Sequence, residues 1–150
     1  MLGWAMTQPD YTPDAVRTLA RLSRVLERGA GDLSLAQYRI LAVVDDGGER
    51  ASWLAERLAV AKPTITAVVD GLVERGYLCR TADDGDRRVT RITLTQTGRR
   101  ALGKAEATMA ESLTDLLAHA DEPAAVVWAL SELGTALDRV RAQRVAAERR

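Results

Sequence analysis

The chain has 150 residues, the length of one domain or of one compact domain with a helical extension. Its apolar fraction of 47% predicts a hydrophobic core, and its 21 basic residues balance 21 acidic ones, which excludes the strongly basic class of nucleic-acid-binding proteins. No apolar run is long enough to cross a bilayer, the first residues lack a signal-peptide pattern, and the single Cys79 excludes an internal disulfide. We therefore expect a cytoplasmic protein with no membrane partner.

The first half of the chain has the pattern of four helices. Apolar residues at helical spacing, with Pro at the first position, predict a helix over residues 13–28. Ser34 and Gln37 form a capping-box pair that predicts the start of a second helix. A short helix is expected over residues 51–60, and a longer one over residues 61–75 ends at a glycine.

The pattern then changes from helix to strand and back. Residues 78–81 and 88–94 show β-branched enrichment and period-two alternation, which predicts two strands joined at an Asp/Gly-rich tip. Thr95 can cap a long helix, and Pro123 can start a last helix whose apolar residues repeat at intervals of three and four. The predicted fold is mainly α with a small antiparallel β-hairpin wing: a winged helix-turn-helix with long dimerisation helices.

Charge is unevenly distributed over this layout. Eight basic and three acidic residues lie between Arg75 and Lys104, so the hairpin region is positive although the whole chain is neutral. A local basic surface can bind DNA in a protein of zero net charge. The hairpin is therefore compatible with a DNA-binding wing.

Three stretches together resemble the multiple antibiotic resistance regulator (MarR) family of bacterial transcription factors. Residues 54–78, "LAERLAVAKPTITAVVDGLVERGYL", are similar to the family's helix-turn-helix. Residues 86–95, "DRRVTRITLT", fit its wing pattern D-x-R-x5-L-T, and residues 94–102, "LTQTGRRAL", fit the entry into its dimerisation helix. Each stretch alone is a weak signal, and the combination is fairly specific.

The resemblance implies a ligand-responsive regulator, most often a repressor, that binds double-stranded DNA at a near-palindromic operator as a homodimer. It also implies a small-molecule effector held between the dimer region and the DNA-binding lobes. The expected organisation is an N-terminal dimerisation helix in residues 1–33, a DNA-binding lobe in residues 34–98 and C-terminal dimerisation helices in residues 99–150.

The expected DNA contacts come from the fourth helix and the wing. Arg88 occupies the family's D-x-R position and is the expected minor-groove residue, with Asp86 placed to orient an arginine. Ala61 and Ala67 stand where the family often carries larger polar residues, so base readout by the helix is expected to be thin. A plain solvated turn and ordinary helix-surface residues remain the alternatives. The candidate DNA-binding residues are Lys62, Pro63, Thr64, Thr66, Ala67, Asp86, Arg87 and Arg88.

Other residues have less specific interpretations. Tyr38 and Trp53 can line a pocket for an apolar effector, and core packing is the alternative for both. Cys79 can sense oxidants or be a packed, inert thiol. His119 is the only histidine, so no metal site and no cofactor are expected.

Two other functional classes are weighed against a regulator. The sequence has no Gly-rich phosphate loop, nucleophile elbow or paired metal-ligand motif, so an enzyme is not expected. A winged-helix interaction or adaptor module without DNA binding remains the alternative, because the net charge is zero. Arg87, Arg88 and Arg91 on one hairpin favour the DNA-binding interpretation.

Overall fold

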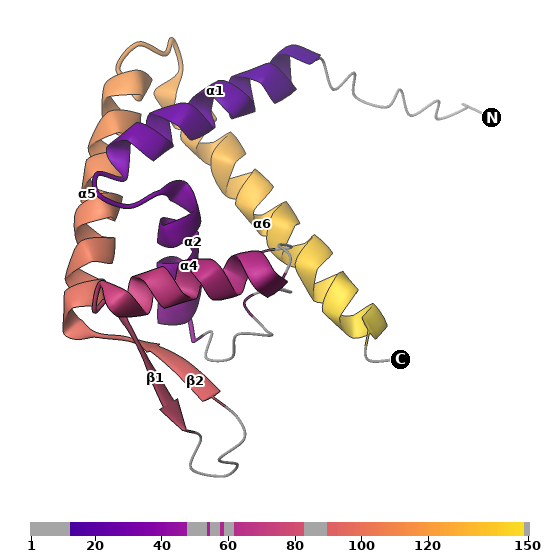
Figure 1. The fold of residues 1–150 in the computed structure, drawn as a ribbon. Helices are drawn as coiled ribbons and strands as arrows, with labels where there is room; N and C mark the ends of the chain where they lie inside the picture. Colours follow the sequence, from indigo (N-terminus) through magenta and orange to yellow (C-terminus); the bar gives the residue numbers. More distant parts are fainter. Residues whose placement is uncertain (1–12, 48–53, 55–57, 59–61, 83–89, 149–150) are drawn as a thin grey trace.

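The computed structural model describes residues 13–47, 54, 58, 62–82 and 90–148 and shows the mainly helical fold with a two-stranded hairpin that the sequence predicts (Figure 1). Its elements in chain order are α1 (Pro13–Gly29), α2 (Leu35–Asp45), α4 (Lys62–Glu74), β1 (Leu78–Ala82), β2 (Thr90–Leu94), α5 (Gln96–Leu117) and α6 (Pro123–Glu148). The short helix expected over residues 51–60 lies outside the described residues except for Leu54 and Leu58. No helix among the described residues has the length and hydropathy needed to span a membrane.

The hydrophobic core lies between α2, α4, the hairpin and the first half of α5. The side chains with the lowest exposure come from α2, α4, the two strands and Leu54: Ile40, Leu41, Leu54, Val69, Leu72, Leu78 and Ile92. Helix α5 adds the buried residues Leu102, Ala105 and Met109. On β2, Ile92 and Leu94 are buried on one face, as the period-two alternation predicts. The antiparallel register pairs Leu78 with Leu94 and Ala82 with Thr90. The hairpin is therefore anchored in the core at its base.

Helix α2 begins where the sequence predicts. The Ser34 side chain accepts a hydrogen bond from the Gln37 amide, and the Gln37 side chain accepts one from the Ser34 amide. This reciprocal pair satisfies two of the amide groups that a helix N-terminus leaves without partners. The first turn of α2 is fixed by these two residues.

The N-terminus of α5 is joined tightly to the turn between α4 and β1. The Thr95 hydroxyl donates to the carbonyl oxygen of Gly76 at 2.6 Å and accepts from the amide of Gly98 at 3.0 Å. Gly98 lies so close to this turn that an added Cβ would be 2.1 Å from the Tyr77 carbonyl oxygen. Only glycine fits at this contact, because the neighbouring atom is backbone and cannot rotate away.

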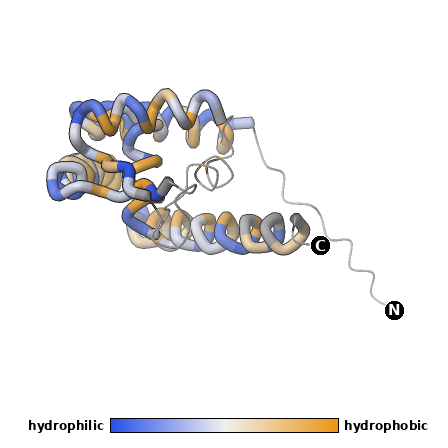
Figure 2. Tube along the Cα trace, turned by 60° about the horizontal axis from the view of Figure 1, so that its bottom comes forward, coloured by the Kyte–Doolittle hydropathy of each residue, from blue (hydrophilic) through white to orange (hydrophobic). Residues whose placement is uncertain are grey.

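The long helices α1 and α6 are packed less completely. Helix α1 meets α5 closely at Gly29, where an added Cβ would be 3.2 Å from the Met109 Cα. Val16 and Leu19 in α1 are nevertheless exposed. Four residues of the predicted repeat in α6 are also exposed, and we call them the α6 stripe: Val126, Leu133, Leu137 and Val140. Apolar segments recur along the helix that leads to the C-terminus in Figure 2.

Candidate nucleic-acid interface

Helix α4 has one face in the core and one face open to solvent. Ile65, Val69 and Leu72 are buried, and they hold the helix against α2 and β1. The side chains of Pro63, Thr64, Thr66 and Ala67 are exposed, as expected for residues that contact DNA. Lys62 is the first residue of the helix. The exposed N-terminal half of α4 therefore offers small and hydroxyl-bearing side chains, which suit close approach to DNA and hydrogen bonds to base edges.

The predicted wing contacts are in the loop between the two strands. Asp86, Arg87 and Arg88 lie outside the described residues, as does Trp53, so their assigned roles stay predictions. The two strands on either side of these residues are described, and they extend away from the C-terminal end of α4 (Figure 1).

An ion pair joins α4 to the hairpin. The Arg80 Nη2 atom on β1 lies 2.5 Å from the Asp70 Oδ1 atom on α4. Both side chains are partly exposed, so the pair adds little to stability. Its geometric effect is to tie the orientation of the hairpin to that of the helix. The pair joins residues ten positions apart, so the sequence pattern does not indicate it.

Arg75 links the C-terminal end of α4 to three other segments. Its guanidinium donates to the Asp32 carbonyl oxygen at 3.2 Å, to the Gln37 side-chain oxygen at 3.4 Å and to the Tyr77 hydroxyl at 3.2 Å. Its central carbon is 4.6 Å from the centre of the Tyr77 ring, within the range of a cation–π contact. Sequence reasoning missed this role because the partners Asp32 and Gln37 are about forty residues away along the chain.

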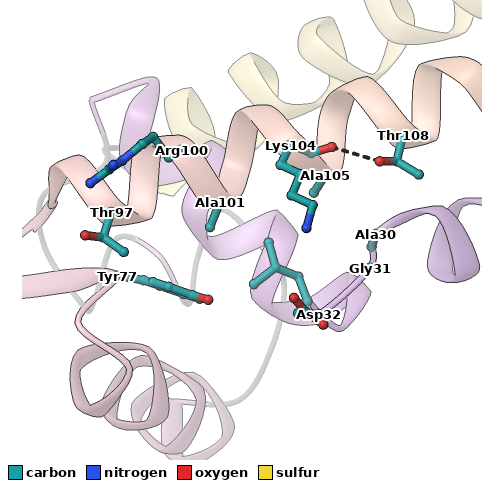
Figure 3. Close-up of a pocket in the computed structure, with 11 residues that line it drawn as sticks. Ala30, Gly31, Asp32, Tyr77, Thr97, Arg100, Ala101, Lys104, Ala105 and Thr108 are labelled. Atoms are coloured by element: carbon teal, nitrogen blue, oxygen red, sulfur yellow. Dashed lines mark hydrogen bonds between the residues drawn. The ribbon is translucent and has the colours of Figure 1, made fainter.

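A cavity of about 340 Å³ lies beside this junction, between the α1–α2 connection and α5 (Figure 3). Arg100 and Lys104 project from α5, whereas Asp32 lies on the opposite wall and Tyr77 closes the base. The remaining lining is small or apolar: Ala30, Gly31, Leu33, Thr97, Ala101, Ala105 and Thr108. The cavity can therefore hold a small organic molecule with an apolar body and an anionic group.

The Tyr38 side chain predicted to line a pocket is half-buried and packs against the core. Burial raises the pKa of its hydroxyl, and the negative charges of Glu106 and Asp46 act in the same direction. Tyr38 is not among the residues that line the cavity beside Arg75. The predicted role of Tyr38 as an effector contact therefore stays untested, and its described environment is that of a core residue.

Cys79 and His119 have ordinary surroundings. Cys79 is half-buried on β1, and its Sγ atom lies 3.0 Å from the Thr93 hydroxyl on the paired strand. His119 is exposed, and its Nδ1 atom lies 2.8 Å from the Asp115 carbonyl oxygen. Across the part of the chain that the structure describes, no group of three or more metal-ligating side chains comes together.

Comparison with known proteins shows which families and folds this chain resembles. Residues 31–89 match the sequence profile of the MarR family. The fold is similar to that of the regulator BldR from Sulfolobus solfataricus, with 26% identity, a TM-score of 0.69 and coverage of 89% of this chain and 99% of BldR. Over residues 31–89 the chain resembles the MarR family.

Two further similar proteins are regulators of transcription. The curated HTH-type transcriptional regulator YpoP of Bacillus subtilis is 35% identical over 72 residues, which cover 47% of this chain and about half (51%) of YpoP. The repressor CouR of Rhodococcus jostii, in its complex with a 23-mer DNA duplex, is 27% identical with a TM-score of 0.71, over 83% of this chain and 89% of CouR.

Proposed function

We propose that this protein is a MarR-type regulator: a dimeric, sequence-specific DNA-binding transcriptional regulator that acts as a repressor and responds to a small molecule. The observation that carries this proposal is the placement of α4. Its buried face fixes it in the lobe, and its exposed face presents Pro63, Thr64, Thr66 and Ala67 at the end where Lys62 begins the helix. Similarity to CouR, whose structure was solved with a DNA duplex, supports DNA binding by this chain.

DNA binding would use two parts of the lobe. The N-terminal half of α4 would enter the major groove, where a threonine hydroxyl can bond a base edge and its methyl can contact thymine. Lys62 would contact a phosphate, and Arg88 in the loop between the strands would enter the minor groove. The Asp70–Arg80 ion pair supports this division, because it holds α4 and the hairpin at a fixed angle.

Dimerisation is supported by apolar surface that this chain does not cover by itself. The α6 stripe is exposed, Leu137 to 70%, and Trp128 on the same helix is exposed to 67%. A groove of about 650 Å³ lies nearby between α1, the end of α5 and the start of α6, lined mainly by apolar side chains such as Leu22, Leu113 and Leu130. Burial of these side chains against a second copy would remove a large apolar surface from water.

The cavity beside Arg75 is the site that we propose for the effector. It lies between helix α5 and the connection that leads into α2, so an occupant can contact both the dimerisation helices and the lobe. Two basic side chains, Arg100 and Lys104, favour an organic anion such as a carboxylate. An effector alters DNA binding only if it binds the two states of the protein with different affinity.

The proposal is tested by fluorescence anisotropy with DNA from beside the protein's own gene, against scrambled DNA of the same length. Thr64→Val keeps the shape of the side chain and removes its hydroxyl, so it should cost about 1 kcal/mol on the operator and nothing on scrambled DNA. Lys62→Ala should weaken binding to both DNAs and lower the slope of the salt dependence by about 1. Thr114→Val, on the exposed surface of α5, is the matched control.

Each outcome decides between the two functional classes. Selective, salt-sensitive binding that Thr64→Val weakens and Thr114→Val does not supports the regulator. The opposite outcome is no selective binding by anisotropy. If genome-wide capture with the wild-type protein then also recovers no selected DNA, the adaptor interpretation replaces the regulator.

A further inference from the structure

The cavity and the DNA-binding helix share a single polar junction, and Arg75 is at its centre. Arg75 follows the last residue of α4 directly. Two of its hydrogen-bond partners, Asp32 and Tyr77, also line the cavity. A molecule in the cavity that moves the Tyr77 ring or the backbone at Asp32 must therefore change the contacts of the residue that ends α4.

The third partner of Arg75 extends this junction to α2. The Gln37 side-chain oxygen accepts from Arg75 at 3.4 Å and from the Ser34 amide at 2.9 Å. That oxygen belongs to the capping box, so it is held by the first turn of α2. The guanidinium is suited to such a position because its rigid, forked set of donors bonds several acceptors at once.

We propose that Arg75 is the positioning residue through which occupation of the cavity changes the orientation of α4. The inference rests on the effector response proposed above and assigns it a physical route. In the structure Arg75 bonds Asp32, Gln37 and Tyr77, which holds the C-terminal end of α4 against the α1–α2 connection. An occupant that displaces both Tyr77 and Asp32 weakens two of these three bonds and frees the end of the helix.

The test replaces the unidentified effector by a side chain built into the cavity. Ala101 lines the cavity on α5, and Ala101→Phe places a benzyl group there. Ala110→Phe adds the same group about two and a half turns further along the same helix, on its exposed surface, and is the matched control. Both substitutions are made in the wild-type chain and in Arg75→Met, which keeps the length of the side chain and removes its donors.

The readout is amide hydrogen exchange of residues 68–72 in the middle of α4, measured by NMR on the full chain without DNA. These amides do not line the cavity, so they report transmission along the helix. We expect Ala101→Phe to change their exchange rates about fivefold, the size of a modest coupling between sites, and Ala110→Phe to leave them unchanged. In Arg75→Met the effect of Ala101→Phe should disappear. Arg75→Lys, which keeps the charge and loses the fork, should retain part of it.

Two results would overturn the inference. One is an equal effect of Ala101→Phe with and without Arg75, which would mean that other contacts carry the change. The other is no effect of Ala101→Phe in the wild-type chain. If Arg75→Met does not fold, the comparison is made with Arg75→Lys and with Tyr77→Phe, which removes only the hydroxyl that accepts from Arg75.

This readout separates the inference from the proposed function. Exchange is measured without DNA, so a protein that fails to bind any operator can still show the Arg75-dependent change. Conversely, a protein that binds its operator tightly can lack the change. Operator affinity is then measured by anisotropy for Ala101→Phe and Ala110→Phe, each in the wild-type chain and in Arg75→Met. A loss of affinity that requires Arg75 would connect the junction to DNA binding.

Discussion

The DNA-binding lobe and the helix α6 differ in how completely each covers its own apolar residues. In the lobe, Leu41 from α2 and Leu72 from α4 are fully buried among residues of the same chain. In α6, Leu137 and Trp128 are mostly exposed, although apolar residues recur along the helix at intervals of three and four. The same kind of periodicity therefore produces a finished core in one region and an open surface in the other. The lobe covers its apolar residues by its own packing, whereas those of α6 are left exposed in this chain.

The largest effect is expected from the lobe core. Leu41→Ala should lower the free energy of unfolding by about 4 kcal/mol, because it removes a fully buried side chain and leaves a cavity. Urea denaturation followed by circular dichroism measures this change. The loss should not depend on protein concentration, since Leu41 packs within its own lobe. In Leu137→Ala any loss should grow smaller as the protein is diluted below its dimer dissociation constant. Equal behaviour of the two variants would contradict the distinction between the regions.

The next effect concerns the joint between the lobe and α5. Gly98→Ala should cost about 3 kcal/mol, because the new methyl group meets the Tyr77 carbonyl in a turn that Thr95 holds in place. Gly103→Ala on the same helix has open space around it and should stabilise the chain by about 0.5 kcal/mol or slightly more. Thermal unfolding should show a lower melting temperature than the wild type for Gly98→Ala and a higher one for Gly103→Ala. A neutral Gly98→Ala would mean that the joint can open without cost.

Local patterns in the sequence predict the elements of both regions. The capping box at Ser34, the cap at Thr95 and the alternation around Ile92 are each confirmed where the sequence places them. These features depend on neighbours within a few residues, so a single sequence is enough to find them. The family resemblance, carried by short motifs, is confirmed in the same way.

Contacts between distant segments are not predictable in this way. The Arg75 junction joins residues about forty positions apart, and the cavity between α5 and the α1–α2 connection exists only once those segments pack. The Asp70–Arg80 pair joins a helix to a strand. In each case the residue types are ordinary surface residues, and their partners are decided by the tertiary fold. The exposed residues of α4 could be predicted, but the contacts that orient α4 could not.

A smaller effect is expected when the α6 stripe is made polar. Leu133→Ser should raise the dissociation constant of the dimer about tenfold, because the leucine would otherwise be buried against the second copy. Sedimentation velocity over a range of concentrations measures the shift, and the secondary structure should be unchanged. Glu132→Ser, at the adjacent exposed position, is the control. If the wild-type protein is a monomer at all concentrations, α6 is covered by some other partner.

The smallest effect tests how firmly α2 and α5 are packed together. Burial and the nearby carboxylates of Glu106 and Asp46 raise the pKa of Tyr38 above its ordinary value of about 10. The folded state therefore holds this proton more tightly than the unfolded state, so the stability contributed by the protonated hydroxyl is complete below pH 10 and decreases as the pH rises through the folded pKa. Other groups also titrate in this range, so the informative quantity is the difference between the wild type and Tyr38→Phe. Between pH 9 and 11 the wild type should lose more unfolding free energy than Tyr38→Phe, as followed by urea titration at each pH. Identical pH dependence of the two proteins would mean that water reaches the Tyr38 hydroxyl. The contact between α2 and α5 would then resemble the open surface of α6 more than the closed core around Leu41.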